Sequence, residues 1–237
     1  MIGLLLAWMC MPFHSSAQSQ PSTYEVSVRE LSIPPKALHA FEQGMERLAN
    51  QDAAGSLPHF QRAIQEYAGY SEAYDRLGAA DLKLWHGPEA EQAFRKSIEV
   101  SGGQYAHPLI ALGAILDDQE KFAEAESIIR KGLDLDHDSW TGHYYLALAL
   151  FGLNRVEDAA KSVLDALQRK TDFPNAHLLL ADIHCREKVY TSAVSDLDEY
   201  LKLAPDGPDS SRAKALRAFA QGMISASQNN IDVARSQ

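Results

Sequence analysis

The stretch WTGHYYLALALFGLNRVEDAAKSVLDALQRKTDF, residues 140–173, decides the fold of this 237-residue chain. Its first part, Trp140 to Gly152, carries apolar residues at helical spacing, and Val156 to Arg169 carries a second helical pattern. Asn154 between them is a turn residue. The stretch therefore predicts two helices joined by a short turn. One such hairpin cannot bury its apolar face alone, so it needs neighbours.

The same pattern recurs along the chain with a period of 34 residues and one single-residue insertion. The copies occupy 37–70, 71–105, 106–139, 140–173 and 174–207. Position 8 of each copy is small: Gly44, Gly78, Gly113, Ala147 and Ala181. Position 20 is also small: Ser56, Ala90, Ala125, Ala159 and Ala193. Position 24 is large and apolar: Phe60, Phe94, Ile129, Val163 and Leu197.

Small residues at fixed positions let two helices approach closely, while the large residue beside them fills the groove. A repeat of this length and spacing predicts stacked helical hairpins. We therefore expect an all-α fold, a right-handed α-solenoid of five hairpins. A capping helix over residues 208–226 should cover the last hairpin with the stripe Leu216, Phe219, Ala220, Met223 and Ile224. Residues 227–237 are polar and are predicted to form a flexible tail.

The N-terminal segment has the features of a secretory signal peptide over residues 1–17. Its apolar run, Ile2 to Phe13, is shorter than the roughly 20 residues that span a bilayer. Ser15 and Ala17 are small and suit cleavage after Ala17. No Lys or Arg precedes the run, so a retained hydrophobic tail or a misassigned start are the alternatives. We expect export to the periplasm or the extracellular space, with a linker and short extended arm over 18–36.

Composition limits the partners of the chain. Its net charge is −10 and its pI is about 5.3. Nucleic acids and anionic membrane surfaces attract clustered Lys and Arg, so neither is expected as a partner. After removal of residues 1–17 we expect no membrane span. The two cysteines, Cys10 and Cys185, are too few for a disulfide framework.

The chain resembles the tetratricopeptide repeat (TPR) family, and in particular bacterial TPR proteins that carry a signal peptide. The resemblance covers residues 37–207 and rests on a Leu followed by a small residue at positions 7 and 8. The clearest matches are Leu77–Gly78, Leu112–Gly113, Leu146–Ala147 and Leu180–Ala181. Two departures are His143 and His177 at position 4, where the family usually has a large residue, and only Pro205 supplies the family's proline at position 32.

The resemblance implies that the first helix of each repeat lines a concave groove through positions 2, 5, 9 and 12. An amphipathic helix or an extended peptide with apolar anchors and a basic residue would suit it. The alternative for each residue is packing against a neighbouring helix. The candidate groove residues are Leu38, Phe41, Met45, Glu72, Asp75, His107, Ile110, Asp117, Thr141, Tyr144, Leu148, Phe151, Asn175, Leu178 and Asp182.

One family function is not expected. TPR domains that hold a chaperone's terminal carboxylate use a clamp of Lys, Asn and Arg. Of the corresponding residues here, only one is basic, and it stands where the clamp has Asn. The residues are Phe41, Met45, Arg76, His107 and Ala111.

Catalytic and metal sites are not expected either. His177, Asp182, His184 and Cys185 lie close in sequence, but the two histidines are seven residues apart, about 10 Å along a helix. Ligand bonds near 2 Å cannot bridge that separation. The chain has no GxSxG, P-loop, HExxH or CxxC motif. We expect no cofactor and no enzymatic activity.

The expected function is a non-catalytic protein–protein interaction scaffold in the bacterial cell envelope. One alternative is a self-assembling structural protein, a possible homo-oligomer joined through the apolar face of Leu38, Phe41, Met45 and Leu48. The other is a carbohydrate- or cell-wall-associated accessory factor. Its stacking platforms would be Tyr67, Tyr70, Tyr74, Tyr144 and Tyr145.

Overall fold

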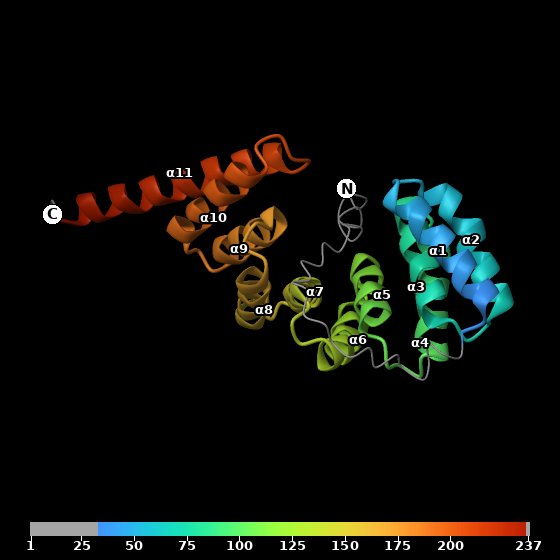
Figure 1. Cartoon of the computed structure of the whole chain (residues 1–237). Coiled ribbons are helices and arrows are strands. Elements are labelled where there is room, and N and C mark those ends of the chain that lie inside the picture. The colour runs from blue at the N-terminus through green and yellow to red at the C-terminus, as the bar shows by residue number, and fades with distance from the viewer. Residues whose placement is uncertain (1–32, 236–237) are drawn as a thin grey trace, which may run out of the picture. The chain divides into compact units, whose positions relative to one another are not determined.

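The computed structural model describes residues 33–235, and side chains up to residue 229. All regular elements in this range are α-helices (Figure 1). The predicted signal peptide and residues 18–32 of the predicted linker and arm lie outside the described residues. The helices are α1 (Pro35–Ala49), α2 (Ala53–Glu66), α3 (Ser71–Lys83), α4 (Gly87–Val100), α5 (Ala106–Asp118), α6 (Phe122–Leu135), α7 (Trp140–Gly152), α8 (Val156–Arg169), α9 (Pro174–Arg186), α10 (Tyr190–Leu203) and α11 (Ser210–Arg235).

The helices follow the predicted order of five pairs and a final helix, so the all-α repeat fold is confirmed. The first member of each pair is called helix A and the second helix B. Helices α7 and α8 have the bounds that the repeat pattern predicts. Helix α1 begins at Pro35, where a missing N–H costs nothing. Asp52 accepts a hydrogen bond from the Gly55 N–H at 2.8 Å and so caps α2.

The chain divides into two compact units. The N-terminal unit ends at Asp118 and contains helices α1 to α5. The C-terminal unit begins at Gln119 and contains helices α6 to α11. The boundary falls in the turn of the third repeat, so each unit has its own stacked hairpins and is described by itself.

The turn between helices A and B has the same backbone shape in every repeat. Position 15 is left-handed, with φ between 60° and 63°, although none of its residues is glycine: Gln51, Trp85, Glu120, Asn154 and Lys188. The next N–H bonds five residues back, as from Arg155 to the Leu150 carbonyl at 2.9 Å. This is the hydrogen-bond pattern that closes a helix around a left-handed residue. Of these five residues, only Asn154 is of a type that commonly adopts the left-handed conformation, so only the fourth turn is indicated by the sequence.

Within the N-terminal unit, the small residue at position 8 lies under an aromatic ring. A Cβ added to Gly44 would lie 2.6 Å from the ring of Phe60, and one added to Gly78 would lie 3.0 Å from Phe94. Both rings are fully buried. Glycine is required here because the ring of helix B rests directly on the backbone of helix A.

The C-terminal unit uses smaller partners at the same two positions. Ala147 and Val163 in the fourth repeat are fully buried. In the fifth, Ala181 and Leu197 form a core cluster with Tyr200 of α10 and Ala213 of α11. An alanine suffices at position 8 because position 24 is aliphatic.

Helix α11 differs from its prediction at one end. The capping helix was expected to stop at residue 226, but it continues to Arg235 (Figure 1). Apart from Gly222, no proline or glycine interrupts residues 210–235, so nothing in the sequence stops the helix. Among the described residues, no helix is both long and apolar enough to cross a membrane.

Candidate functional site

The N-terminal unit exposes apolar side chains on helix A of the first repeat. Leu38 is 42% exposed and Met45 is 36% exposed. Phe41 lies between them in sequence and is half-buried, with its ring centroid 5.7 Å from that of Phe60 and 5.0 Å from that of Tyr70. Residues 38, 41 and 45 have the spacing of one helix face, so an apolar stripe runs along α1 with its middle member held by the core.

Asp75 and His107, both candidate groove residues, bind each other, and only the His107 side chain is partly exposed. The Asp75 carboxylate is fully buried, and its Oδ1 lies 2.6 Å from Nδ1 of His107. The Tyr105 hydroxyl donates to Oδ2 at 3.1 Å, and the Arg76 Nε lies 3.7 Å away. Burial, followed by the charge of Asp75, raises the pKa of Tyr105.

This cluster joins α3 to the start of α5 and satisfies a carboxylate that would otherwise be buried alone. Asp75 is therefore inaccessible to a ligand as the unit stands. Tyr105 is a structural partner of Asp75 that the repeat pattern does not reveal, because it lies in the linker before α5.

The remaining candidates of this unit differ in exposure. Ile110 is buried, at 2% exposure, and packs in the core. Glu72 is half-buried and accepts a hydrogen bond from the Ser71 hydroxyl at 2.9 Å. Asp117 is half-buried, and its Oδ1 is buried without a hydrogen-bond partner. Burial raises the pKa of Asp117 to about 7, and the charge of Asp118 adds to the shift.

In the C-terminal unit, two candidate groove residues are core residues. Tyr144 is 4% exposed and Leu178 is 6% exposed. The ring of Tyr144 meets the ring of Phe173 edge-on, with 4.7 Å between centroids. Phe173 also packs against Trp140 at 4.8 Å. Tyr144 therefore supports the junction of the fourth and fifth repeats and is not a surface anchor.

The other candidates of this unit are half-buried: Thr141, Leu148, Phe151, Asn175 and Asp182. Their charges and rings are already engaged within the unit. The Arg186 guanidinium lies 3.8 Å from the ring centroid of Phe151, at cation–π distance. Arg212 of α11 binds both oxygens of Asp182 at 2.7 and 2.6 Å. Burial raises the pKa of Asp182, and Arg212 opposes that shift.

The histidines and the cysteine that were weighed as metal ligands have other roles. Nδ1 of His184 lies 2.6 Å from the Asp196 carboxylate. Nδ1 of His177 is buried without a hydrogen-bond partner. Cys185 is half-buried, and desolvation raises the pKa of its thiol. Within the described part of the chain, no group of three His, Cys, Asp or Glu residues could hold a metal ion.

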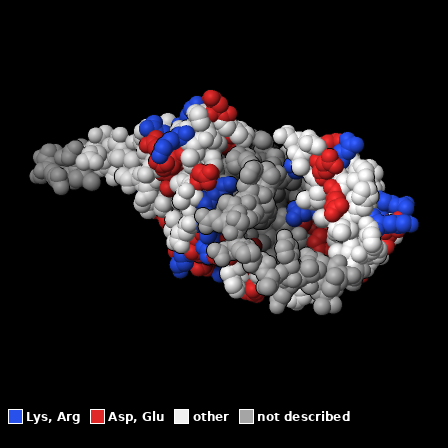
Figure 2. All heavy atoms as spheres, viewed as in Figure 1, with Lys and Arg blue, Asp and Glu red and all other residues white. Residues whose placement is uncertain are grey.

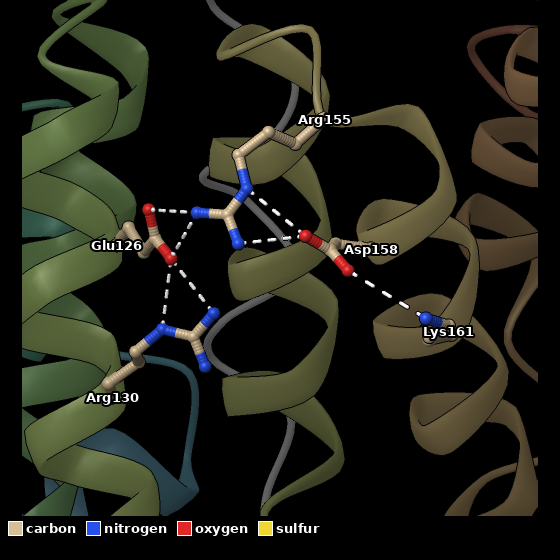
Figure 3. A network of polar contacts seen from close by, with 5 residues as sticks. All are labelled: Glu126, Arg130, Arg155, Asp158 and Lys161. Atoms are coloured by element: carbon tan, nitrogen blue, oxygen red, sulfur yellow. Dashed lines mark hydrogen bonds and ion pairs between the residues drawn. The ribbon is translucent and has the colours of Figure 1, made fainter.

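The densest polar network lies between α6 and the start of α8 (Figure 3). Arg155 contacts both oxygens of Glu126 at 2.8 and 3.0 Å and also donates twice to Asp158. Arg130 donates to Glu126 at 2.8 Å, and Lys161 lies 3.9 Å from Asp158. Every charge in the network has a partner inside it. The network therefore orients consecutive B helices rather than presenting a free charge to a ligand.

Charge and aromatic exposure bear on the alternative functions. On the face shown in Figure 2, acidic and basic side chains are interspersed within each unit rather than gathered by sign. Tyr70, Tyr144 and Tyr145 are at most 5% exposed. Three of the five tyrosines proposed as stacking platforms are thus packing residues, and nothing favours the carbohydrate alternative.

A shallow cleft of about 630 Å³ lies among α2, α3 and α4. Its basic residues are engaged locally, with Lys96 bound to Glu99 at 2.8 Å and Arg95 bound to Glu91 at 2.8 Å. Asp81 in the cleft lies 3.2 Å from Nδ1 of His86. The charges of Lys96, Arg95 and Asp81 in the cleft are thus paired with neighbouring residues of the same unit.

Comparison with known proteins supports the repeat assignment. The tetratricopeptide repeat family model matches residues 110–174. No protein with a curated description matches the chain.

Solved structures share the fold over most of the chain. MamA from Desulfovibrio magneticus RS-1 is 15% identical, with a TM-score of 0.63 over 75% of this chain and 99% of that one. PilF of Pseudomonas aeruginosa is 16% identical, with a TM-score of 0.68 over 85% and 88%. YrrB, described as a TPR protein with an unusual peptide-binding site, is 15% identical, with a TM-score of 0.59 over 76% and 92%.

At these identities the likeness establishes the fold and not the ligand. The family match, the five helix pairs and the shared fold agree with one another. The candidate groove as a binding surface stays a prediction, with Leu38 and Met45 as its exposed members. Residues 110–174 match the tetratricopeptide repeat family model, and the chain shares the helical-hairpin fold of solved tetratricopeptide repeat proteins.

Proposed function

We propose that this protein is a non-catalytic scaffold that binds an amphipathic helix or peptide on the A-helix face of its N-terminal unit. The observation that carries the proposal is the exposure of Leu38 and Met45 on one face of α1. Among the described residues of this unit, Trp85 is the only other exposed large apolar side chain. Two of the three therefore coincide with predicted groove positions.

The physical argument is the cost of leaving these side chains in water. Covering a Leu or Met side chain contributes about 1.5–3 kcal/mol. Phe41 between them is already fixed against Phe60 and Tyr70, so little rotamer entropy is lost there on binding. A partner with two apolar side chains one or two helical turns apart would cover all three residues.

The neighbouring A helix adds a preference for charge. Helix α3 lies beside α1 and carries Glu72 at a predicted groove position. Its carboxylate is half-buried and accepts a hydrogen bond from the neutral Ser71 hydroxyl. A Lys or Arg on the partner would pair with it, so we expect apolar anchors followed by a basic residue. The peptide-binding site in the description of YrrB supports peptide recognition by a protein of this fold.

Peptide display against the full chain tests this proposal. We expect selected peptides to carry apolar residues at helical spacing with a Lys or Arg. The double variant Leu38→Ser, Met45→Ser should weaken their binding at least about tenfold, because two apolar contacts are lost. The matched control Trp85→Ser changes an exposed apolar residue elsewhere in the unit and should bind normally. Equal binding by the double variant and the wild type would refute the surface assignment.

Export to the periplasm or beyond the cell is part of the proposal and rests on the sequence of residues 1–17 alone. An envelope location would place the scaffold beside assembly or secretion partners. N-terminal mass spectrometry of the protein from its native host tests it. A mature chain that begins at Gln18 supports export, and an intact Met1 in a soluble cell fraction contradicts it.

A further inference from the structure

Helix α11 is longer than the helix that supports it. It has 26 residues, against 14 in α10, so it extends about 39 Å beside a helix of about 21 Å. Ala213 and Ala220 are fully buried, and Leu216 packs with Ala213 in the core cluster of α10. Figure 1 shows the C-terminal part of α11 continuing past the end of α10. An isolated helical extension of this length is marginal in water and needs a partner.

A second apolar stripe lies on α11 beside the buried one, and its Phe219 ring meets the ring of Tyr190 of α10 edge-on, with 6.1 Å between centroids. Phe219, Gly222, Met223 and Ala226 are all exposed, and they have the i, i+3, i+4, i+7 spacing of one helix face. Phe219 is 54% exposed and Met223 is 37% exposed. A Cβ added to Gly222 would meet nothing within 4 Å. This second stripe is therefore open, with a gap at its centre where another helix could approach closely.

The stripe lies in a part of α11 that carries no charge. Residues 218–229 contain no Lys, Arg, Asp or Glu. Figure 2 shows this portion of α11 as an unbroken white stretch. The chain as a whole has a net charge of −10, so two copies carry net charge of the same sign. Two copies of the chain can therefore contact each other through the second stripe without bringing like charges together.

The order of side chains in the stripe fits a second copy of itself. In an antiparallel pair with a two-fold axis between residues 222 and 223, Phe219 lies level with Ala226 of the partner subunit. Gly222 lies level with Met223 of the partner subunit. Each large side chain meets a small one, and a two-fold interface requires this self-complementarity. A foreign partner would not explain why each large side chain of the stripe has a small one at the same distance on the other side of one point.

We infer that α11 pairs antiparallel with α11 of a second copy through Phe219, Gly222, Met223 and Ala226. Specific interfaces bury about 1,200–2,000 Å², and a single helix pair lies at or below the lower end. The dimer is therefore weak, with a dissociation constant of about 10–500 μM, corresponding to roughly −7 to −4.5 kcal/mol. This surface is separate from the one on α1, so its failure and that of the proposed peptide site are distinguishable.

Sedimentation equilibrium of the full chain from about 5 μM to 1 mM tests the inference across that range. We expect a reversible monomer–dimer equilibrium. Gly222→Leu should shift the protein to monomer at least about tenfold, because the new side chain meets Met223 of the partner subunit. The same change raises helix propensity, so retained or increased helicity by circular dichroism separates lost pairing from lost folding.

Two further variants fix the geometry. The control Gln221→Leu adds the same side chain on a different face of α11 and should dimerise as the wild type does. Ala226→Phe should abolish the dimer because Phe would face Phe, and Ala226→Phe with Phe219→Ala should restore it by exchanging large for small.

A monomer at every concentration overturns the inference. A dimer that Gly222→Leu leaves intact, or one lost only in Leu38→Ser, places self-association on another face and overturns it equally.

Discussion

The two units build the same hairpin with different side chains. In the N-terminal unit, glycine at position 8 lies against phenylalanine at position 24, as in Gly44 and Phe60. In the C-terminal unit, alanine stands at position 8 and Val163 or Leu197 at position 24. The comparison shows that the side chains at positions 8 and 24 share one packing space, so that a larger residue at one position requires a smaller residue at the other. A small residue in the repeat pattern is interpretable only together with the residue that rests on it.

The units also differ in how they use carboxylates. Asp75 in the N-terminal unit is fully buried and held by Tyr105 and His107. Asp182 in the C-terminal unit is paired with Arg212, whose side chain is half exposed. Both lie on A helices at predicted groove positions, so position alone does not decide whether a carboxylate faces a ligand or the core.

The largest effect should come from removing the buried carboxylate. Asp75→Ala is expected to lower the free energy of unfolding by about 3 kcal/mol, because it leaves the part-buried Tyr105 hydroxyl and His107 ring without their shared carboxylate partner. Asp182→Ala should cost less, about 1–2 kcal/mol, because its partner Arg212 is half exposed and water can solvate the guanidinium once the carboxylate is lost. Urea unfolding of the two variants measures the contrast. Equal losses would mean that Asp75 is solvated in solution.

The next largest effect on stability should come from the packing of position 8 against position 24. Gly44→Ala should cost about 2 kcal/mol despite better helix propensity, because its Cβ would meet the Phe60 ring at 2.6 Å. Gly44→Ala combined with Phe60→Val transplants the pair of the fourth repeat and should recover stability relative to Phe60→Val alone. Thermal unfolding of the three variants forms a double-mutant cycle. Additive losses would show that positions 8 and 24 are independent.

Asp117 predicts a dependence of stability on pH. Its folded pKa of about 7 lies above the unfolded value of about 3.9, so the folded state holds a proton that the unfolded state has lost. Stability should therefore fall as the pH rises from 4 to 7. Asp117→Asn should remove this fall and, for a half-buried group, stabilise by about 1–2 kcal/mol at pH 8.

The measurement for Asp117 is the difference in urea midpoint between wild type and Asp117→Asn at pH 4.5 and pH 8. The C-terminal unit fills the same repeat position with Phe151 and Cys185, so it lacks this carboxylate. A difference that is the same at both pH values would contradict the raised pKa.

The smallest effect concerns the shared turn. Lys188 has φ of 63°, a left-handed conformation that costs a non-glycine residue about 1 kcal/mol. Lys188→Gly should therefore stabilise the C-terminal unit by up to about that amount. Asn154→Gly at the equivalent turn should gain less, because asparagine tolerates this conformation. Thermal unfolding compares them, and a loss of stability in Lys188→Gly would refute the strain.

Much of the fold was predictable because the same pattern occurs in five copies, so that each helix is indicated by five aligned segments of sequence. The bounds of α7 and α8, the restart at Pro174 and the small residues at position 8 all follow from periodicity. The length of α11 was not predictable, because this helix lies outside the repeat and its C-terminal end is marked by polar residues only, without a proline or glycine. The left-handed turns were mostly hidden, since Gln51, Trp85, Glu120 and Lys188 are not typical turn residues.

The candidate site was less predictable than the fold. The family groove positions include Asp75, Ile110, Tyr144 and Leu178, which are buried. Their burial depends on residues outside the pattern, such as Tyr105 and Phe173, that no periodicity identifies. Exposure of Leu38 and Met45 arises because they belong to the first repeat, which has no preceding described helix to cover its A helix.

The most direct test of the binding surface is site-specific photo-crosslinking in the native host. A photoreactive residue replaces Leu38, Met45 or, as the control, Trp85, and the crosslinked protein is identified by mass spectrometry. The account predicts one common partner from positions 38 and 45, captured through a segment with apolar residues at helical spacing, and no capture of it from position 85. The same partner captured equally from position 85, or none from positions 38 and 45, would contradict the assignment of this face as the binding surface.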